Sequence, residues 1–267
     1  TDEFCSAVYT DNKGSNYAKF YKESDRKFYN KRVAAIYTPK VDFLFKSLKN
    51  EGLEPKNLRY ADIGAGSGYF VAALQQAGCV HTKGYEVSES QVSLANHFLK
   101  SGSLVHHGIA DTASIASSLD VDVVSMIGVL EHIQNPNDIL NALINNPNVK
   151  YIYVLIPMFS FSVFMEMVFP LVMPRQLAAG HTHLYTKSSL EWTEKKYKLS
   201  RVGEWWFGTD LVDLYRSISV MLKKNTNTKT MTEKWREAML PCIDEMQLEM
   251  DKLRLSSDAH ILWKKQK

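Results

Sequence analysis

The chain has 267 residues, of which 45% are hydrophobic and 23% charged, and its formal net charge is +3. This length suits one α/β domain with additions, and the composition is that of a globular protein. The small net charge gives no clear basic face, so we expect no nucleic-acid partner. The apolar stretch 158–173 contains Glu166 and Pro170, and it is too short for a transmembrane segment. No basic and then apolar leader opens the sequence, which favours a cytoplasmic location.

The first part of the chain predicts an N-terminal helical cap over residues 1–55. Tyr17, Tyr21 and Phe28 recur there at helical spacing. From residue 56 onward, strand and helix patterns alternate. The expected strands are residues 58–63, 82–87, 104–107, 121–127 and 151–156, and the helices between them are 69–77, 88–100 and 136–143. This alternation predicts an α/β fold with a doubly wound, mostly parallel sheet.

After Pro157 the pattern loosens. We expect helices over residues 188–196 and 210–222, a sixth strand over 199–207 and a final strand over 260–263. The helical pattern of residues 232–255 is interrupted at Pro241. We therefore predict one domain over residues 56–267, with a lid-like segment at 158–187 and a helical insertion at about 210–255.

A glycine-rich loop follows the first expected strand. Gly64, Gly66 and Gly68 are spaced G-x-G-x-G, and Asp62 lies two residues before the first of them. Glycine permits a positive φ and a close approach of a ligand to the backbone. A carboxylate at this place would repel a pyrophosphate and attract a cation. Glu86, at the end of the second expected strand, suits a ribose diol.

These motifs resemble the cofactor site of class I S-adenosylmethionine-dependent methyltransferases. Residues 62–68 match the family's first motif, Glu86 its ribose-binding acid, and residues 127–133 the segment after the fourth strand in the UbiE-like, small-molecule branch. The resemblance implies a seven-stranded Rossmann-like fold, S-adenosylmethionine as cofactor and S-adenosylhomocysteine as product. The cofactor residues it implies are Asp62, Gly64, Ala65, Gly66, Gly68, Glu86, Val87, Ile127 and Gly128.

One departure concerns the end of the third expected strand. Family members often place an acid directly after the glycine there, where it meets the adenine amine. In this chain Gly108 is followed by Ile109 and Ala110, and the acid is Asp111. Either Asp111 reaches the adenine or backbone groups replace it.

Three histidines are candidates for the catalytic group. Methyl transfer to a hydroxyl is aided by a base, and histidine titrates near neutral pH. His132 follows the fourth expected strand, whereas His181 and His183 lie in Gly-His-Thr-His beyond the fifth. Structural roles for all three remain open. An H-x-H pair without a neighbouring carboxylate or cysteine set is weak support for a metal, so we expect none.

The stretch 180–185 and the helical N-terminal part look similar to methyltransferases of bacterial surface-polysaccharide pathways. This looser resemblance implies O-methylation of a sugar, a sugar nucleotide or a glycan substituent. A lipid or quinone-like acceptor is the alternative, and an NAD-binding oxidoreductase or a non-catalytic partner protein represents other classes. An apolar stripe in the insertion either forms a homodimer interface or packs on its own domain: Met239, Cys242, Ile243, Met246 and Met250.

Overall fold

The computed structural model describes residues 8–10, 25–172, 174–177 and 180–266. Tyr17 and Tyr21 therefore lie outside the described residues. Seven strands form one sheet in the order β3-β2-β1-β4-β5-β7-β6, and β7 runs antiparallel to the other six. The strands are β1 (Tyr60–Ile63), β2 (Thr82–Glu86), β3 (Leu104–His106), β4 (Val123–Ile127), β5 (Tyr151–Pro157), β6 (Leu199–Phe207) and β7 (Asp258–Lys265). The predicted fold class is confirmed.

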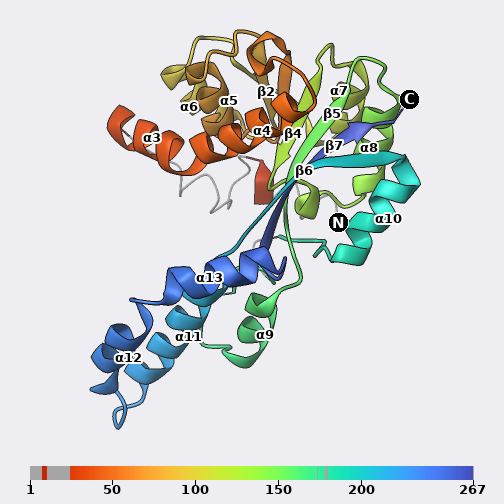
Figure 1. Ribbon diagram of the computed structural model, residues 1–267. Coiled ribbons are helices and arrows are strands. Elements are labelled where there is room, and N and C mark those ends of the chain that lie inside the picture. Colours follow the sequence, from red (N-terminus) through yellow and green to blue (C-terminus); the bar gives the residue numbers. More distant parts are fainter. Residues whose placement is uncertain (1–7, 11–24, 173, 178–179, 267) are drawn as a thin grey trace.

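Helices cover both faces of the sheet (Figure 1). One face packs on α3 (Arg26–Arg32), η1 (Val33–Tyr37), α4 (Thr38–Asn50), α5 (Tyr69–Gln76) and α6 (Glu89–Phe98), with the short η2 (Pro55–Asn57) before β1. The other face packs on α7 (Thr112–Ser118), α8 (Pro136–Asn145) and α10 (Lys187–Tyr197). Strand β5 alternates between the two cores, because successive side chains of a strand point to opposite faces. Tyr153 joins the first core, whereas Ile152 and Val154 join the second.

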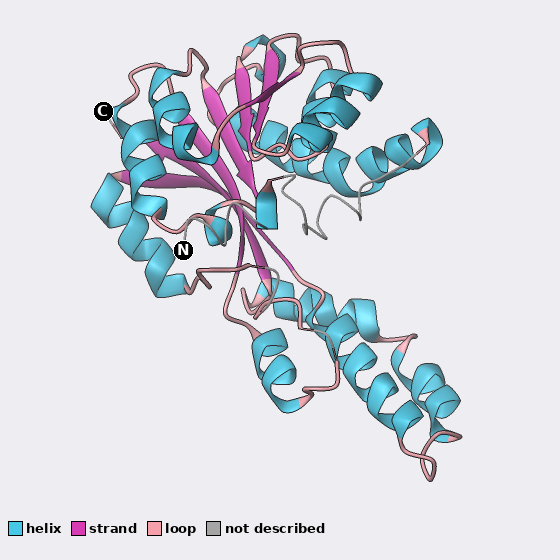
Figure 2. Ribbon diagram, turned by 180° about the vertical axis from the view of Figure 1, so that it is seen from behind, coloured by secondary structure: helices cyan, strands magenta, loops and turns pink. Residues whose placement is uncertain are grey.

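The helical insertion projects from one end of the sheet (Figures 1 and 2). It contains α11 (Asp210–Lys224), α12 (Met231–Met239) and α13 (Ile243–Lys252), and α9 (Phe161–Val168) packs against α11. The break around Pro241 is confirmed. Met239 and Ile243 are buried against Leu211 of the same chain, whereas Met246 is exposed. Much of the apolar stripe therefore packs within its own chain.

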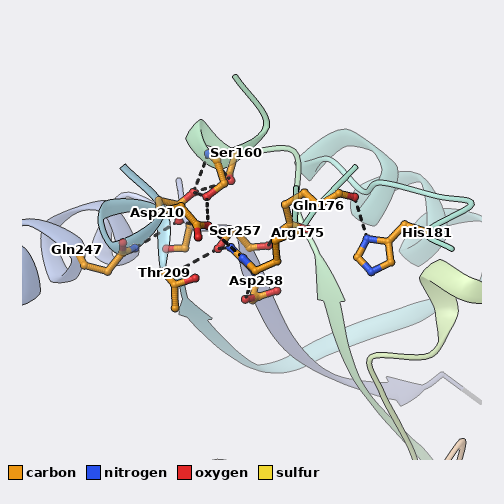
Figure 3. Close-up of polar contacts among 12 residues, drawn as sticks. Ser160, Arg175, Gln176, His181, Thr209, Asp210, Gln247, Ser257 and Asp258 are labelled. Carbon is orange, nitrogen blue, oxygen red and sulfur yellow. Dashed lines mark hydrogen bonds and ion pairs between the residues drawn. The ribbon is translucent and has the colours of Figure 1, made fainter. Parts of the chain in front are cut away.

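A buried carboxylate connects the helical insertion to the sheet through hydrogen bonds (Figure 3). Asp210, at the first position of α11, is fully buried. It accepts hydrogen bonds from the hydroxyls of Ser160 and Ser162 at 2.6 and 2.8 Å, and from the backbone N–H of Ser257 at 2.9 Å. Beside it, Arg175 forms an ion pair with Asp213 at 3.0 Å. These contacts join three segments that are distant in sequence.

Among the helices that the structure describes, none has the length and apolar character needed to span a membrane.

Candidate cofactor and acceptor site

A cavity of about 520 Å³ lies at the carboxyl ends of β1, β2 and β4. Strand β1 pairs with β2 on one side and with β4 on the other, and the chain proceeds from this point in opposite directions across the sheet. Ligands of doubly wound sheets bind at such a switch point. The position of the cavity agrees with that of the glycine loop predicted from the sequence.

The glycine loop forms the floor of the cavity. Gly64, Gly66 and Gly68 have φ values of +69°, +53° and +74°, which glycine adopts at little cost. A Cβ on Gly64 would lie 2.5 Å from Val129 Cγ2, so this position also lacks space for a side chain. Gly68 caps the N-terminus of α5 in the left-handed conformation. The positive φ values and the lack of space at Gly64 therefore both require glycine in this loop.

Glu86 connects the loop to the turn after β2. Its Oε2 accepts a hydrogen bond from Gly66 N at 2.7 Å, and its Oε1 accepts bonds from the N–H groups of Val87 and Ser88 at 2.8 and 2.9 Å. Burial raises the pKa of this carboxyl, and the three N–H donors oppose the rise by favouring the charged form. The carboxylate therefore fixes the two loops that face the cavity.

Asp62 lies beneath the loop and is 2% exposed. Its Oδ1 accepts a hydrogen bond from the Ser125 hydroxyl at 2.6 Å. Burial raises the pKa of Asp62 to about 7, the Ser125 bond lowers it, and the nearby charge of Glu86 raises it further. A bound cation would favour the ionised form.

Asp111 does not line the cavity wall, although Ile109, Ala110 and Thr112 do. It ends the short helix η3 (Ile109–Asp111). Its Oδ2 would lie 2.8 Å from a Cβ built on Gly108, so the side chain folds back over its own turn. The carboxyl of Asp111 is thus directed to Gly108 and is not part of the wall.

His132 and His181 lie together, and His183 lies apart from them. The His132 ring lines the cavity, and the centroid of the His181 ring is 4.9 Å from it. Neither His181 nor His183 is among the lining residues, and His183 Nδ1 contacts the Thr182 hydroxyl at 2.9 Å. Burial lowers the pKa of His132 to about 4 and also lowers that of His181. In both rings burial favours the neutral form.

A long-range contact produces this pairing. His132 ends the short helix η4 (Leu130–His132) after β4. The backbone carbonyl of Glu131 accepts hydrogen bonds from Thr182 N at 2.7 Å and His183 N at 3.2 Å. The segment after β5 is therefore fixed against the segment after β4, and this brings His181 to His132.

Several wall residues were not predicted from the sequence. Gln91 and His107 line the cavity, and so do three aromatic residues: Tyr9, Tyr37 and Tyr69. Polar side chains after β4 form part of the wall, namely Gln134, Asn135 and Asp138. The rule that ligands bind beyond strand carboxyl ends could have indicated His107 and Gln134. The tyrosines come from helices and had no comparable signal.

Comparison with known proteins agrees with this geometry. Residues 29–200, more than half of the chain, match a family model described as a methyltransferase domain. The chain belongs to this methyltransferase family. It is a class I S-adenosylmethionine-dependent enzyme, which sets aside the oxidoreductase that the sequence left open.

Individual relatives are more distant. A ubiquinone biosynthesis O-methyltransferase of Aromatoleum aromaticum is 33% identical over 91 residues, which are 33% of this chain and 38% of that protein. The match thus spans well under half of the relative's length. An S-adenosylmethionine-dependent methyltransferase of Archaeoglobus fulgidus has a TM-score of 0.54 at 17% identity, covering 94% of this chain and all of that one. The plantazolicin methyltransferase BamL has a TM-score of 0.57 at 14% identity, covering 94% and 90%. At these identities the two structures show the shared fold alone.

Proposed function

We propose that this methyltransferase transfers the methyl group to an oxygen of a sugar, a sugar nucleotide or a glycan substituent. The polar wall after β4 carries the proposal. His132, Gln134, Asn135 and Asp138 all line the cavity that the glycine loop closes on another side. Such groups donate and accept hydrogen bonds, which suits an acceptor with several hydroxyls.

We infer the cofactor contacts from the same cavity. The methionine part of the cofactor is held by Gly64, Ala65, Gly66 and Gly68. The carboxylate of Asp62 stabilises the positive charge of this part of the cofactor. Glu86 and Val87 hold the ribose, and Ile127 and Gly128 flank the sulfur. Each of these residues lines the cavity except Gly68, which caps the N-terminus of α5. The backbone of residues 109–110, rather than the Asp111 carboxyl, faces the adenine.

Binding of S-adenosylmethionine should weaken as the pH falls from 8 to 6. Burial holds the folded-state pKa of Asp62 at about 7, and the sulfonium and ammonium groups favour the ionised carboxyl. Cofactor binding therefore releases a proton below this pKa, and we expect the Kd to rise about tenfold between pH 8 and 6. Because the folded pKa lies above the unfolded one, Asp62 makes the unliganded protein less stable as the pH rises from about 4 to 7.

Calorimetry over this pH range checks the prediction, with Asp62→Asn as the matched control. The variant should bind weakly at all pH values and show little pH dependence. An equally steep pH dependence in Asp62→Asn would assign the proton to another group.

The reaction is an in-line displacement at the methyl carbon. A bond forms between the acceptor oxygen and that carbon while the carbon–sulfur bond breaks. The products are the methyl ether, S-adenosylhomocysteine and one proton, which leaves the acceptor hydroxyl. The enzyme must align the oxygen and exclude water. We assign contact with the acceptor hydroxyl to His132, which lines the cavity, with the His181 ring packed beside it. We give His183 no contact with the acceptor.

A second candidate is a lipid or quinone-like acceptor. Two observations favour it: the relative from Aromatoleum aromaticum acts in ubiquinone biosynthesis by its name, and α9 exposes a row of apolar side chains. These are Phe161, Phe164, Met167 and Val168, which are between 46% and 68% exposed.

Release of S-adenosylhomocysteine distinguishes the two acceptor classes. The enzyme is supplied with S-adenosylmethionine and either hydroxylated sugar nucleotides or hydroxylated quinones, each beside the same compound with the hydroxyl removed. We expect turnover with a sugar-containing acceptor, its loss with the deoxy compound, and its loss in His132→Ala. Turnover with the quinones alone would replace the sugar by a lipid-like substrate.

A further inference from the structure

Three metal-binding side chains converge beside the cavity. Glu131 and His132 come from η4, and His181 comes from the segment after β5. One ligand atom of each lies within 4.8 Å of the others. The Oε1 of Glu131 and the Nε2 of His132 are 3.9 Å apart. About 50 residues separate these segments, so the fold and not the local sequence brings the three together.

Hydrogen bonds hold both imidazoles with Nε2 available for a ligand. Tyr9 donates its hydroxyl proton to Gly180 O at 3.1 Å, so its oxygen can accept from His132 Nδ1–H at 2.6 Å. His181 Nδ1 lies 2.9 Å from Gln176 O, which can only accept (Figure 3). His181 thus carries its proton on Nδ1 and a lone pair on Nε2, and His132 has the same arrangement when Tyr9 donates to Gly180 O. Histidine ligands of metals are oriented by such a bond from the other ring nitrogen.

The buried carboxyl group of Glu131 lacks a hydrogen-bond partner for one of its oxygens. Its residue is 4% exposed, and its Oε2 has no hydrogen-bond partner among the described residues. A buried carboxyl oxygen without a partner is costly to the fold. A cation bound by this carboxylate would offset the cost of burying its charge.

We propose that Glu131, His132 and His181 bind one divalent first-row transition metal ion, for which Zn²⁺ is the probe. Two imidazoles and one carboxylate are a ligand set of zinc enzymes that leaves a position open, whereas Mg²⁺ and Ca²⁺ prefer oxygen ligands. Ligands around tetrahedral zinc lie about 3.4 Å apart. From separations within 4.8 Å, the ligand atoms would have to move closer together by up to about 1.4 Å.

The role of the ion rests on the proposed function. Because His132 lines the cavity, a metal held by its Nε2 would lie beside the space that we assign to the acceptor. A metal ion lowers the pKa of a coordinated hydroxyl. The hydroxyl proton then leaves to solvent before or during transfer, and the products are those given above. The two histidines would orient the acceptor through the metal instead of acting as free bases.

The test is calorimetric titration of the tag-free protein with Zn²⁺ after treatment with EDTA. We expect one ion per chain with a micromolar or tighter Kd. Glu131→Gln and His181→Ala should each weaken binding at least tenfold. His183→Ala is the matched control, because it removes an imidazole two residues away that lies outside the cluster, and it should leave zinc binding unchanged.

Binding of S-adenosylhomocysteine, titrated in the same samples, shows that each variant is folded. If the wild type binds this nucleoside but no zinc, the metal site is wrong and the methyltransferase function stands. Equal losses in His183→Ala and His181→Ala would show non-specific surface binding and also overturn the site. Zinc bound as expected in a protein that methylates no hydroxyl would contradict the proposed acceptor and leave the metal site intact.

Discussion

Gly66→Arg should weaken binding of S-adenosylhomocysteine at least 100-fold. Gly66 lines the cavity, and its φ of +53° is unfavourable for any residue with a Cβ. A Cβ there would lie 3.1 Å from Gln91 Oε1, another wall atom, so an arginine must extend into the space that the cofactor needs. Calorimetry measures the loss directly.

Gly102→Arg is the matched control for this variant. Gly102 also has a positive φ, of +80°, but a Cβ there meets nothing within 4 Å. The substitution imposes a similar backbone cost, roughly 1–2 kcal/mol, at a site outside the cavity wall. We expect its affinity for the nucleoside to stay within about twofold of wild type. Similar losses in both variants would mean that backbone strain, and not blocking of the cavity, explains the result.

Asp210→Ala should lower the free energy of unfolding by about 3–5 kcal/mol. The carboxylate is fully buried and accepts hydrogen bonds from Ser160, Ser162 and Ser257. Removing it leaves these buried donors without a partner and Arg175 with less compensating charge nearby. Because the cluster joins the helical insertion to the sheet (Figure 3), we also expect faster proteolysis within residues 210–255.

Urea denaturation provides this measurement, and Asp244→Ala provides its control. Asp244 is an exposed acid in the first turn of α13, where its removal should cost less than about 1 kcal/mol. Since Asp210 does not line the cavity, folded Asp210→Ala should still bind S-adenosylhomocysteine. A loss below 1 kcal/mol would contradict the structural role that we assign to the cluster.

The sequence predicted those parts of the site that depend on local pattern. The loop from Asp62 to Gly68 requires positive φ at fixed positions, and only glycine meets this requirement cheaply. Glu86 lines the same cavity as this loop, because the carboxyl ends of adjacent parallel strands lie together. The sheet was also predicted, and the bounds of its strands agree with the prediction to within a few residues. Buried parallel strands are recognisable because they are nearly continuous apolar runs.

The parts that the sequence could not predict depend on contacts between distant segments. His181 joins His132 because Thr182 and His183 donate hydrogen bonds to the Glu131 carbonyl, and no local pattern encodes that contact. The sequence showed an H-x-H pair without a carboxylate, which argued against a metal. In the structure Glu131 lies beside His181, whereas His183 lies outside this cluster. The Asp210 cluster was missed for the same reason.

The most direct test of the whole account is calorimetric titration of the wild-type protein with S-adenosylmethionine, S-adenosylhomocysteine and NAD. The glycine loop, the buried Asp62 and the Glu86 carboxylate together predict saturable 1:1 binding of the two sulfur nucleosides and no measurable binding of NAD. Binding of NAD alone, or of none of the three, would contradict the assignment of this cavity to the methyl donor.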